Sequence, residues 1–210
     1  MPKARKIAPV ANNAEKQETY REQINQYNKA MREGFYLQAI LIDYALLEDR
    51  FRSFLYHMGA FKDRQSLRIN ANQSKDDLSR MVEQYKEDDE SKGMGITSIK
   101  GKMKVIRCAI EWACEAEKVD PKDKYRYVLK DRLESLDIQE ILCIIEETTV
   151  WCDYRNEIIH CLLNKNSIAV SEIVQDKAEE GFLLARRLDG QVRELKKGNY
   201  IRRKINLPVS

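Results

Sequence analysis

Long apolar runs are missing from this sequence, and their absence restricts where the protein resides. No stretch approaches the roughly 18 consecutive apolar residues that a transmembrane helix requires. The N-terminus also lacks the apolar segment of a secretory signal peptide. We therefore expect a soluble cytoplasmic protein with no membrane association.

Histidine and paired cysteine are also scarce. The chain has 2 histidines, and its 5 cysteines are odd in number and include no C-x-x-C pair. A zinc site of the usual Cys/His spacing is not expected, and the cysteines are interpreted as small buried hydrophobes in a reducing compartment. No Gly-rich phosphate loop, nucleophile elbow or pair of catalytic carboxylates is present either. We therefore expect no bound metal or cofactor.

Glycine and proline are few, with 8 and 4 residues, and 34% of the chain is charged. This composition, together with apolar residues at three- and four-residue steps and no long alternating pattern, predicts an all-α helical bundle of about six or seven helices. The first expected helix begins at Asn13, the second spans 35–58 and the third is a short one near 74–85. The fourth begins at Thr97 or Ser98, the fifth begins at Pro121, the sixth spans 136–164 and the last ends at Gly198.

Charge and periodicity divide the chain into one domain with two tails. Residues 1–12 are basic, contain two prolines and have no periodicity, which indicates a disordered N-terminal tail. Residues 13–198 form the single all-α domain, and residues 199–210 are predicted to be a basic C-terminal tail. Basic ends are compatible with nucleic acid, but two solvated tails are the preferred interpretation, and the net charge of +3 is too small to name a partner.

The stretch from Leu136 to Asn164 organises the rest of the chain. Its apolar residues recur on one face of a long helix and are Ile141, Ile144, Thr148, Trp151, Ile158 and Leu162. Arg155 falls on that face and needs a carboxylate partner or access to a polar cleft, because a guanidinium keeps its proton. Asn156 and His160 share another face, one turn apart.

Glu48 is, like Arg155, a charged residue on an apolar helix face. It lies on the face of the helix expected over residues 35–58 that also carries Leu37, Leu41, Tyr44, Phe51 and Leu55. The simplest solution is an ion pair between Glu48 and Arg155, which would satisfy both buried charges. The hypothesis requires the two side chains to lie within salt-bridge distance.

The segment Arg155-Asn156-Glu157-Ile158-Ile159-His160 resembles the R-x(4 to 6)-H signature of the HEPN superfamily, in which a polar residue often follows the arginine. A long hydrophobic early helix and a motif on a late helix are similar to that fold. The resemblance implies a HEPN-like domain that acts as a metal-independent endoribonuclease in toxin, abortive-infection or antiviral-defence systems. Two motifs, normally from a homodimer, form one composite site, and a cognate antitoxin or defence partner is a further implication.

The residue types suit that chemistry, since RNA supplies its own nucleophile in the 2′-hydroxyl group. His160 would act as acid or base, Arg155 would stabilise charge on the phosphate, and Asn156 would bind the phosphate or orient the imidazole. One histidine cannot conveniently serve as acid and base in one step, so a dimer with two histidines at one phosphate is favoured.

Other interpretations remain open at this point. The chain could be a non-catalytic helical module that binds RNA or a protein partner, with Arg155 as a structural ion-pair residue. His160 could be an ordinary surface residue, and Asp153 and Glu157 beside it would repel a phosphate. A second match, Arg52 to His57, is interpreted as surface residues at a helix end.

Overall fold

The structure of this chain, a computed structural model, describes residues 13–61, 98–115, 119–161 and 167–209. Its elements are α1 (Asn13–Arg32), α2 (Tyr36–His57), α4 (Ile99–Glu115), α5 (Lys124–Leu133), α6 (Ile138–Cys161), α7 (Ser167–Lys196), the 3-10 turn η1 (Lys197–Asn199) and α8 (Tyr200–Lys204). These ranges contain no β-strand, which confirms the all-α fold class. The tail predicted over residues 1–12 and the short helix predicted near residues 74–85 lie outside the described residues.

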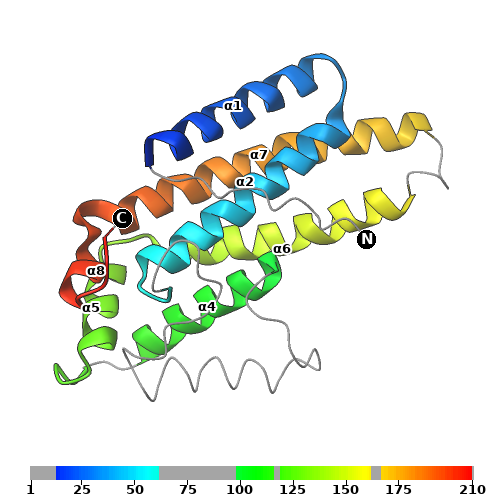
Figure 1. Cartoon of the computed structure of the whole chain (residues 1–210). Helices are drawn as coiled ribbons and strands as arrows, with labels where there is room; N and C mark the ends of the chain where they lie inside the picture. The colour runs from blue at the N-terminus through cyan, green and yellow to red at the C-terminus, as the bar shows by residue number, and fades with distance from the viewer. Residues whose placement is uncertain (1–12, 62–97, 116–118, 162–166, 210) are drawn as a thin grey trace, which may run out of the picture.

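Helices α2 and α7 run side by side through the middle of the bundle (Figure 1). α1 packs on α2, α6 packs on α7, α4 packs on α2 and α6, and α5 and α8 lie together at one end next to α4. Most apolar side chains of α2 are shielded from water, and Leu47, Phe51 and Phe54 are completely buried. Burial of each such side chain contributes roughly 1.5–3 kcal/mol, so this pair of helices provides the rigid frame for α6.

Trp151 on α6 and Gly181 on α7 set the close approach of these two helices. A Cβ atom on Gly181 would lie 2.6 Å from Cζ2 of Trp151, which is closer than real side-chain contacts. The indole Nε1 of Trp151 donates a hydrogen bond to the carbonyl of Lys177 at 2.7 Å. The absence of a side chain at Gly181 therefore makes room for the indole, and its hydrogen bond sets the register of α6.

Most helix ends agree with the sequence signals. Gly34 and Gly59 have φ angles of 76° and 86°, which only glycine adopts without strain, and they bracket α2 as predicted. Ser98 accepts a hydrogen bond from the amide of Gly101 at 3.0 Å and starts α4. The predicted start of α5 at Pro121 is wrong, because Asp123 is the N-cap and accepts from the Arg126 amide at 3.2 Å.

The predicted C-terminal tail is packed instead of solvated. Residues 200–204 form α8, and Arg202 is completely buried. Its Nη1 donates to the carbonyls of Tyr56 and Phe61, both at 2.8 Å, and its Nε donates to the Pro208 carbonyl at 2.7 Å. The basic composition of residues 199–210 did not predict that Arg202 is buried. A guanidinium can be buried when backbone carbonyls accept hydrogen bonds from its N–H groups.

The cysteines are less buried than predicted. Of the four that are described, Cys152 is buried, Cys108 and Cys143 are half-buried, and Cys114 is exposed. Burial raises the pKa of the Cys152 thiol to about 11, so this thiol stays neutral and behaves as a small apolar group. The prediction of a buried hydrophobe is therefore confirmed for Cys152 and wrong for Cys114.

Candidate functional site

The predicted motif lies on the last two turns of α6 and occupies two sides of that helix. Arg155 is half-buried on the side that faces α2, whereas Asn156 and His160 are exposed. At 100° per residue, the side chains of Arg155 and His160 diverge by about 140° around the helix axis. A single copy of α6 therefore does not bring the guanidinium and the imidazole onto one surface.

Arg155 is held in place by two contacts. Its guanidinium carbon lies 4.5 Å from the ring centroid of Tyr44 on α2, a cation–π contact. Its Nη1 also donates to Oδ1 of Asn156 at 2.9 Å. A guanidinium has five N–H donors, and within the described residues only one of them is used. Its Nε is buried and has no hydrogen-bond partner among the described residues, so the donors left to bind an anion are those of the outer guanidinium nitrogens.

The predicted ion pair between Arg155 and Glu48 is wrong. Glu48 accepts a hydrogen bond from Nζ of Lys102 on α4 at 3.1 Å, and the Lys102 side chain is only 1% exposed. A buried ammonium needs a carboxylate more than a half-buried guanidinium does, and Glu48 satisfies it. The sequence signal for this pair is Lys102 itself, a lysine next to Met103 on the buried side of α4.

The charges near His160 differ from those that the sequence suggested. Asp153, one of the two acidic neighbours, forms an ion pair with Lys100 of α4 at 2.5 Å. Both side chains are largely exposed, so the pair adds little stability, but it offsets the negative charge of Asp153. His160 itself makes no hydrogen bond or ion pair with any described residue and faces solvent. Its imidazole is accessible to a ligand or to a second protein chain.

The second sequence match, Arg52 to His57, is not a surface pair. His57 is only 5% exposed, its ring contacts Tyr56 edge-on at 4.9 Å between centroids, and Arg52 is half-buried. The interpretation of His57 as a surface residue is therefore wrong. The last turn of α2 is covered by other elements, and His57 lines a cavity shared with α1 and α7.

An uncovered apolar strip lies next to Arg155. Leu41 on α2 is 53% exposed and Ile159 on α6 is 39% exposed, although Leu41 was predicted to line the buried face. The two helices run antiparallel (Figure 1), so one turn beyond the contact between Tyr44 and Arg155 leads to Leu41 on one helix and Ile159 on the other. We call Leu41, Tyr44 and Ile159 the apolar strip. It remains partly open to solvent in a single chain.

Comparison of the chain with models of known protein families, with curated proteins and with solved structures finds no match. The likeness to the HEPN signature therefore depends on Arg155, Asn156 and His160 and on the helical architecture alone. In the described part of the chain, no helix is long and apolar enough to cross a membrane. The same residues hold no group of three or more His, Cys, Asp or Glu side chains suited to a metal ion.

Proposed function

We propose that this chain is a HEPN-type endoribonuclease that cleaves RNA without a metal ion, at a site completed by a second copy of the chain. The observation that supports the proposal is the way Arg155 is held. Tyr44 and Asn156 orient its guanidinium at the edge of the core, while the imidazole of His160 stays exposed. A cation oriented in this way can stabilise charge that develops on a phosphate.

The proposed reaction begins when the RNA 2′-oxygen attacks the adjacent phosphorus. A bond from the 2′-oxygen to phosphorus forms, and the bond from phosphorus to the 5′-oxygen breaks. One His160 accepts the 2′-hydroxyl proton, and His160 of the second copy donates a proton to the 5′-oxygen. Arg155 stabilises the phosphorane, and Asn156 binds a phosphate oxygen. The products are a 2′,3′-cyclic phosphate and a 5′-hydroxyl end.

A dimer is favoured because Arg155 and His160 of one helix diverge. Two motifs facing each other would place the imidazole of one copy near the guanidinium of the other. The apolar strip of Leu41, Tyr44 and Ile159 supports this arrangement, since covering exposed apolar side chains favours association. Glu48 lies one turn from Tyr44 and, through Lys102, supports the surface under the site instead of acting in it.

Incubation of purified protein with single-stranded RNA in excess EDTA tests the proposal. We expect cleavage that ends in 2′,3′-cyclic phosphates, that disappears in His160→Ala and that falls by at least about 100-fold in Arg155→Lys. Arg203→Lys on α8 is the matched control, because Arg203 is exposed and distant in sequence from the motif. Absence of cleavage of any RNA, or full activity in His160→Ala, contradicts the proposal.

The second candidate is a non-catalytic helical module that binds RNA or a protein partner. The angle of about 140° between Arg155 and His160 favours it, because a single chain presents no assembled acid, base and cation. Light scattering separates the two candidates at low cost. A strict monomer at the concentrations of the cleavage assay would favour the binding module, whereas a dimer that Ile159→Asp dissociates would favour the composite nuclease.

The setting of a toxin or antiviral-defence system follows from the same proposal. Expression of the wild-type chain in bacteria should slow growth, and expression of His160→Ala should not. Equal amounts of soluble protein are expected for both forms and must be verified, because the exposed His160 has no hydrogen bond or ion pair with any described residue. Equal growth inhibition by both forms would argue against RNA cleavage as the cause.

A further inference from the structure

A cavity of about 350 Å³ lies between the start of α1, the end of α2 and the end of α7. Its walls are mostly polar and cationic and include Lys16, Tyr20, Arg50, His57, Arg193 and Lys196. This volume is at the lower end of the range of about 300–1,000 Å³ that small-molecule sites occupy. We call it the cationic cavity.

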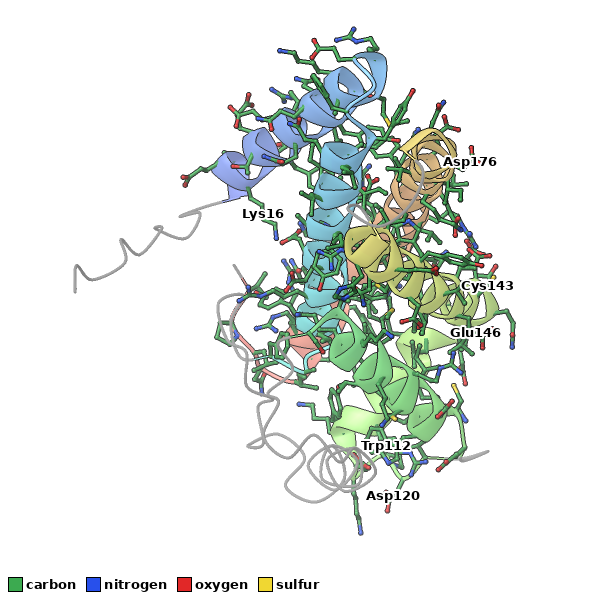
Figure 2. All side chains as sticks on the ribbon, turned by 90° about the vertical axis from the view of Figure 1, so that its right-hand side faces the viewer. Lys16, Trp112, Asp120, Cys143, Glu146 and Asp176 are labelled. Atoms are coloured by element: carbon green, nitrogen blue, oxygen red, sulfur yellow. The ribbon has the colours of Figure 1, made fainter. Side chains whose placement is uncertain are left out.

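Two carboxylates hold the cations of the cavity in place. Asp49 pairs with Lys16 at 2.7 Å and also with Arg50, which lies next to it in α2. Asp189 of α7 pairs with Arg50 at 2.8 Å and with Arg193 at 2.7 Å. Figure 2 shows Lys16 at the start of α1, close to α2. Because the ion pairs link all three helices, Lys16 and Arg50 are already oriented before a ligand arrives, and Arg193 is tethered to Asp189.

The cavity has an excess of positive charge. Its four cationic side chains are opposed by two carboxylates, which leaves a net charge of +2 with His57 neutral. Lys196 forms no ion pair with any described residue, and Arg193 is 76% exposed at its side chain. These two cations are therefore the ones most able to turn towards an anion.

The neutral groups of the wall are hydrogen-bond donors as well. Burial raises the pKa of Tyr20, so its hydroxyl stays protonated, and the guanidinium of Arg50 lies 4.7 Å from the Tyr20 ring centroid. Ser53 and Gln17 add a hydroxyl and an amide. A group with two negative charges and several acceptor oxygens matches this lining, and a phosphate monoester carries about −1.5 to −2 at neutral pH.

We propose that the cationic cavity binds a phosphate monoester, on either a small phosphorylated molecule or the 5′ end of an RNA. The site is separate from the motif on α6. Tyr44, which contacts Arg155, and Ser53, which lines the cavity, are nine residues apart on α2 and point in roughly opposite directions at 100° per residue. The proposal therefore does not depend on RNA cleavage.

Calorimetric titration of the full chain with AMP and with adenosine at low ionic strength tests the site. AMP should bind and adenosine should not, and raising the salt concentration should weaken AMP binding. Lys196→Gln and Arg193→Gln should each weaken it on the order of fivefold. Lys124→Gln, an exposed lysine at the start of α5, is the matched control, and His160→Ala should bind AMP like the wild type.

A second pair of titrations, with 5′-phosphorylated and 5′-hydroxyl forms of one short RNA, identifies the source of the phosphate. Tighter binding of the phosphorylated RNA than of AMP assigns the site to RNA ends, and tighter binding of AMP assigns it to a small molecule; both results support a monoester site. Equal affinity for AMP and adenosine overturns the proposal. AMP binding that is unchanged in both Lys196→Gln and Arg193→Gln overturns it as well.

Discussion

Asp43 is a carboxylic acid in the interior of α2, and its burial makes a quantitative prediction about stability. The residue is 0% exposed, and neither carboxyl oxygen has a hydrogen-bond partner among the described residues. Tyr27 of α1 lies close enough to Asp43 for the carboxylate to raise the pKa of the Tyr27 hydroxyl. This hydroxyl donates its hydrogen bond to the carbonyl of Ala178 at 3.2 Å and not to Asp43. Among the described residues no cation or donor stabilises the anion, and desolvation raises the pKa of Asp43 from 3.8 to about 9.

The shift in this pKa makes the folded state less stable as the pH rises. Below pH 3.8 the carboxyl is protonated in both folded and unfolded chains and has no effect on the balance. Between 3.8 and about 9 the unfolded chain ionises while the folded chain keeps its proton, so stability is progressively lost. One pKa unit corresponds to about 1.4 kcal/mol, so the loss at pH 7 amounts to about 4 kcal/mol.

Asp43→Asn keeps the size of the side chain and removes its ionisation in the unfolded chain. We expect the free energy of unfolding of Asp43→Asn to match that of the wild type near pH 3.5 and to exceed it by up to about 4 kcal/mol at pH 7. Urea denaturation followed by far-ultraviolet circular dichroism at several pH values measures this difference. Asp176→Asn is the control, because Asp176 is exposed on the outer side of α7 (Figure 2).

The decisive observation is how the difference in free energy of unfolding between Asp43→Asn and wild type changes with pH, and not the sign of that difference at one pH. A constant difference between Asp43→Asn and wild type from pH 3.5 to pH 7 would mean that Asp43 ionises normally in the folded chain. A wild type that becomes more stable than Asp43→Asn on raising the pH would show that an unrecognised partner stabilises the carboxylate. Either result would refute the assignment of Asp43 as a neutral buried acid.

Three further predictions concern one packing contact and two sets of buried hydrogen bonds, and thermal and urea denaturation can check them. Gly181→Ala should lower the free energy of unfolding by about 1–3 kcal/mol, because the new methyl group overlaps the indole of Trp151, and an unchanged stability would contradict the close contact. Arg202→Met should cost on the order of 3 kcal/mol, because the buried carbonyls of Tyr56 and Phe61 and the part-buried hydrogen bond to Pro208 lose their donor; Arg203→Met next to it should be nearly neutral. Tyr125→Phe should cost about 1 kcal/mol through the lost hydrogen bond to the Met58 carbonyl, with Tyr127→Phe as the exposed control.

The sequence was informative about local structure. Periodicity and composition predicted the helical class, and the glycines at 34 and 59 marked the ends of α2, because a positive φ angle is a property of the residue itself. The same reasoning misplaced the start of α5 by a few residues. Asp120 and Asp123 are both capable caps, and Asp120 instead accepts from the Lys122 amide at 2.8 Å in a preceding turn.

The sequence by itself determined which residues share a face of each helix, and so it already placed Arg155 and His160 on different faces of α6. Only the tertiary structure decided the partners of the buried charges: Lys102 for Glu48, Tyr44 for Arg155 and backbone carbonyls for Arg202. The physical reason is that helical periodicity is set by the local backbone, whereas a charge on an apolar face can be satisfied by a group from any helix that packs on it. Which helices meet depends on the packing of the whole core.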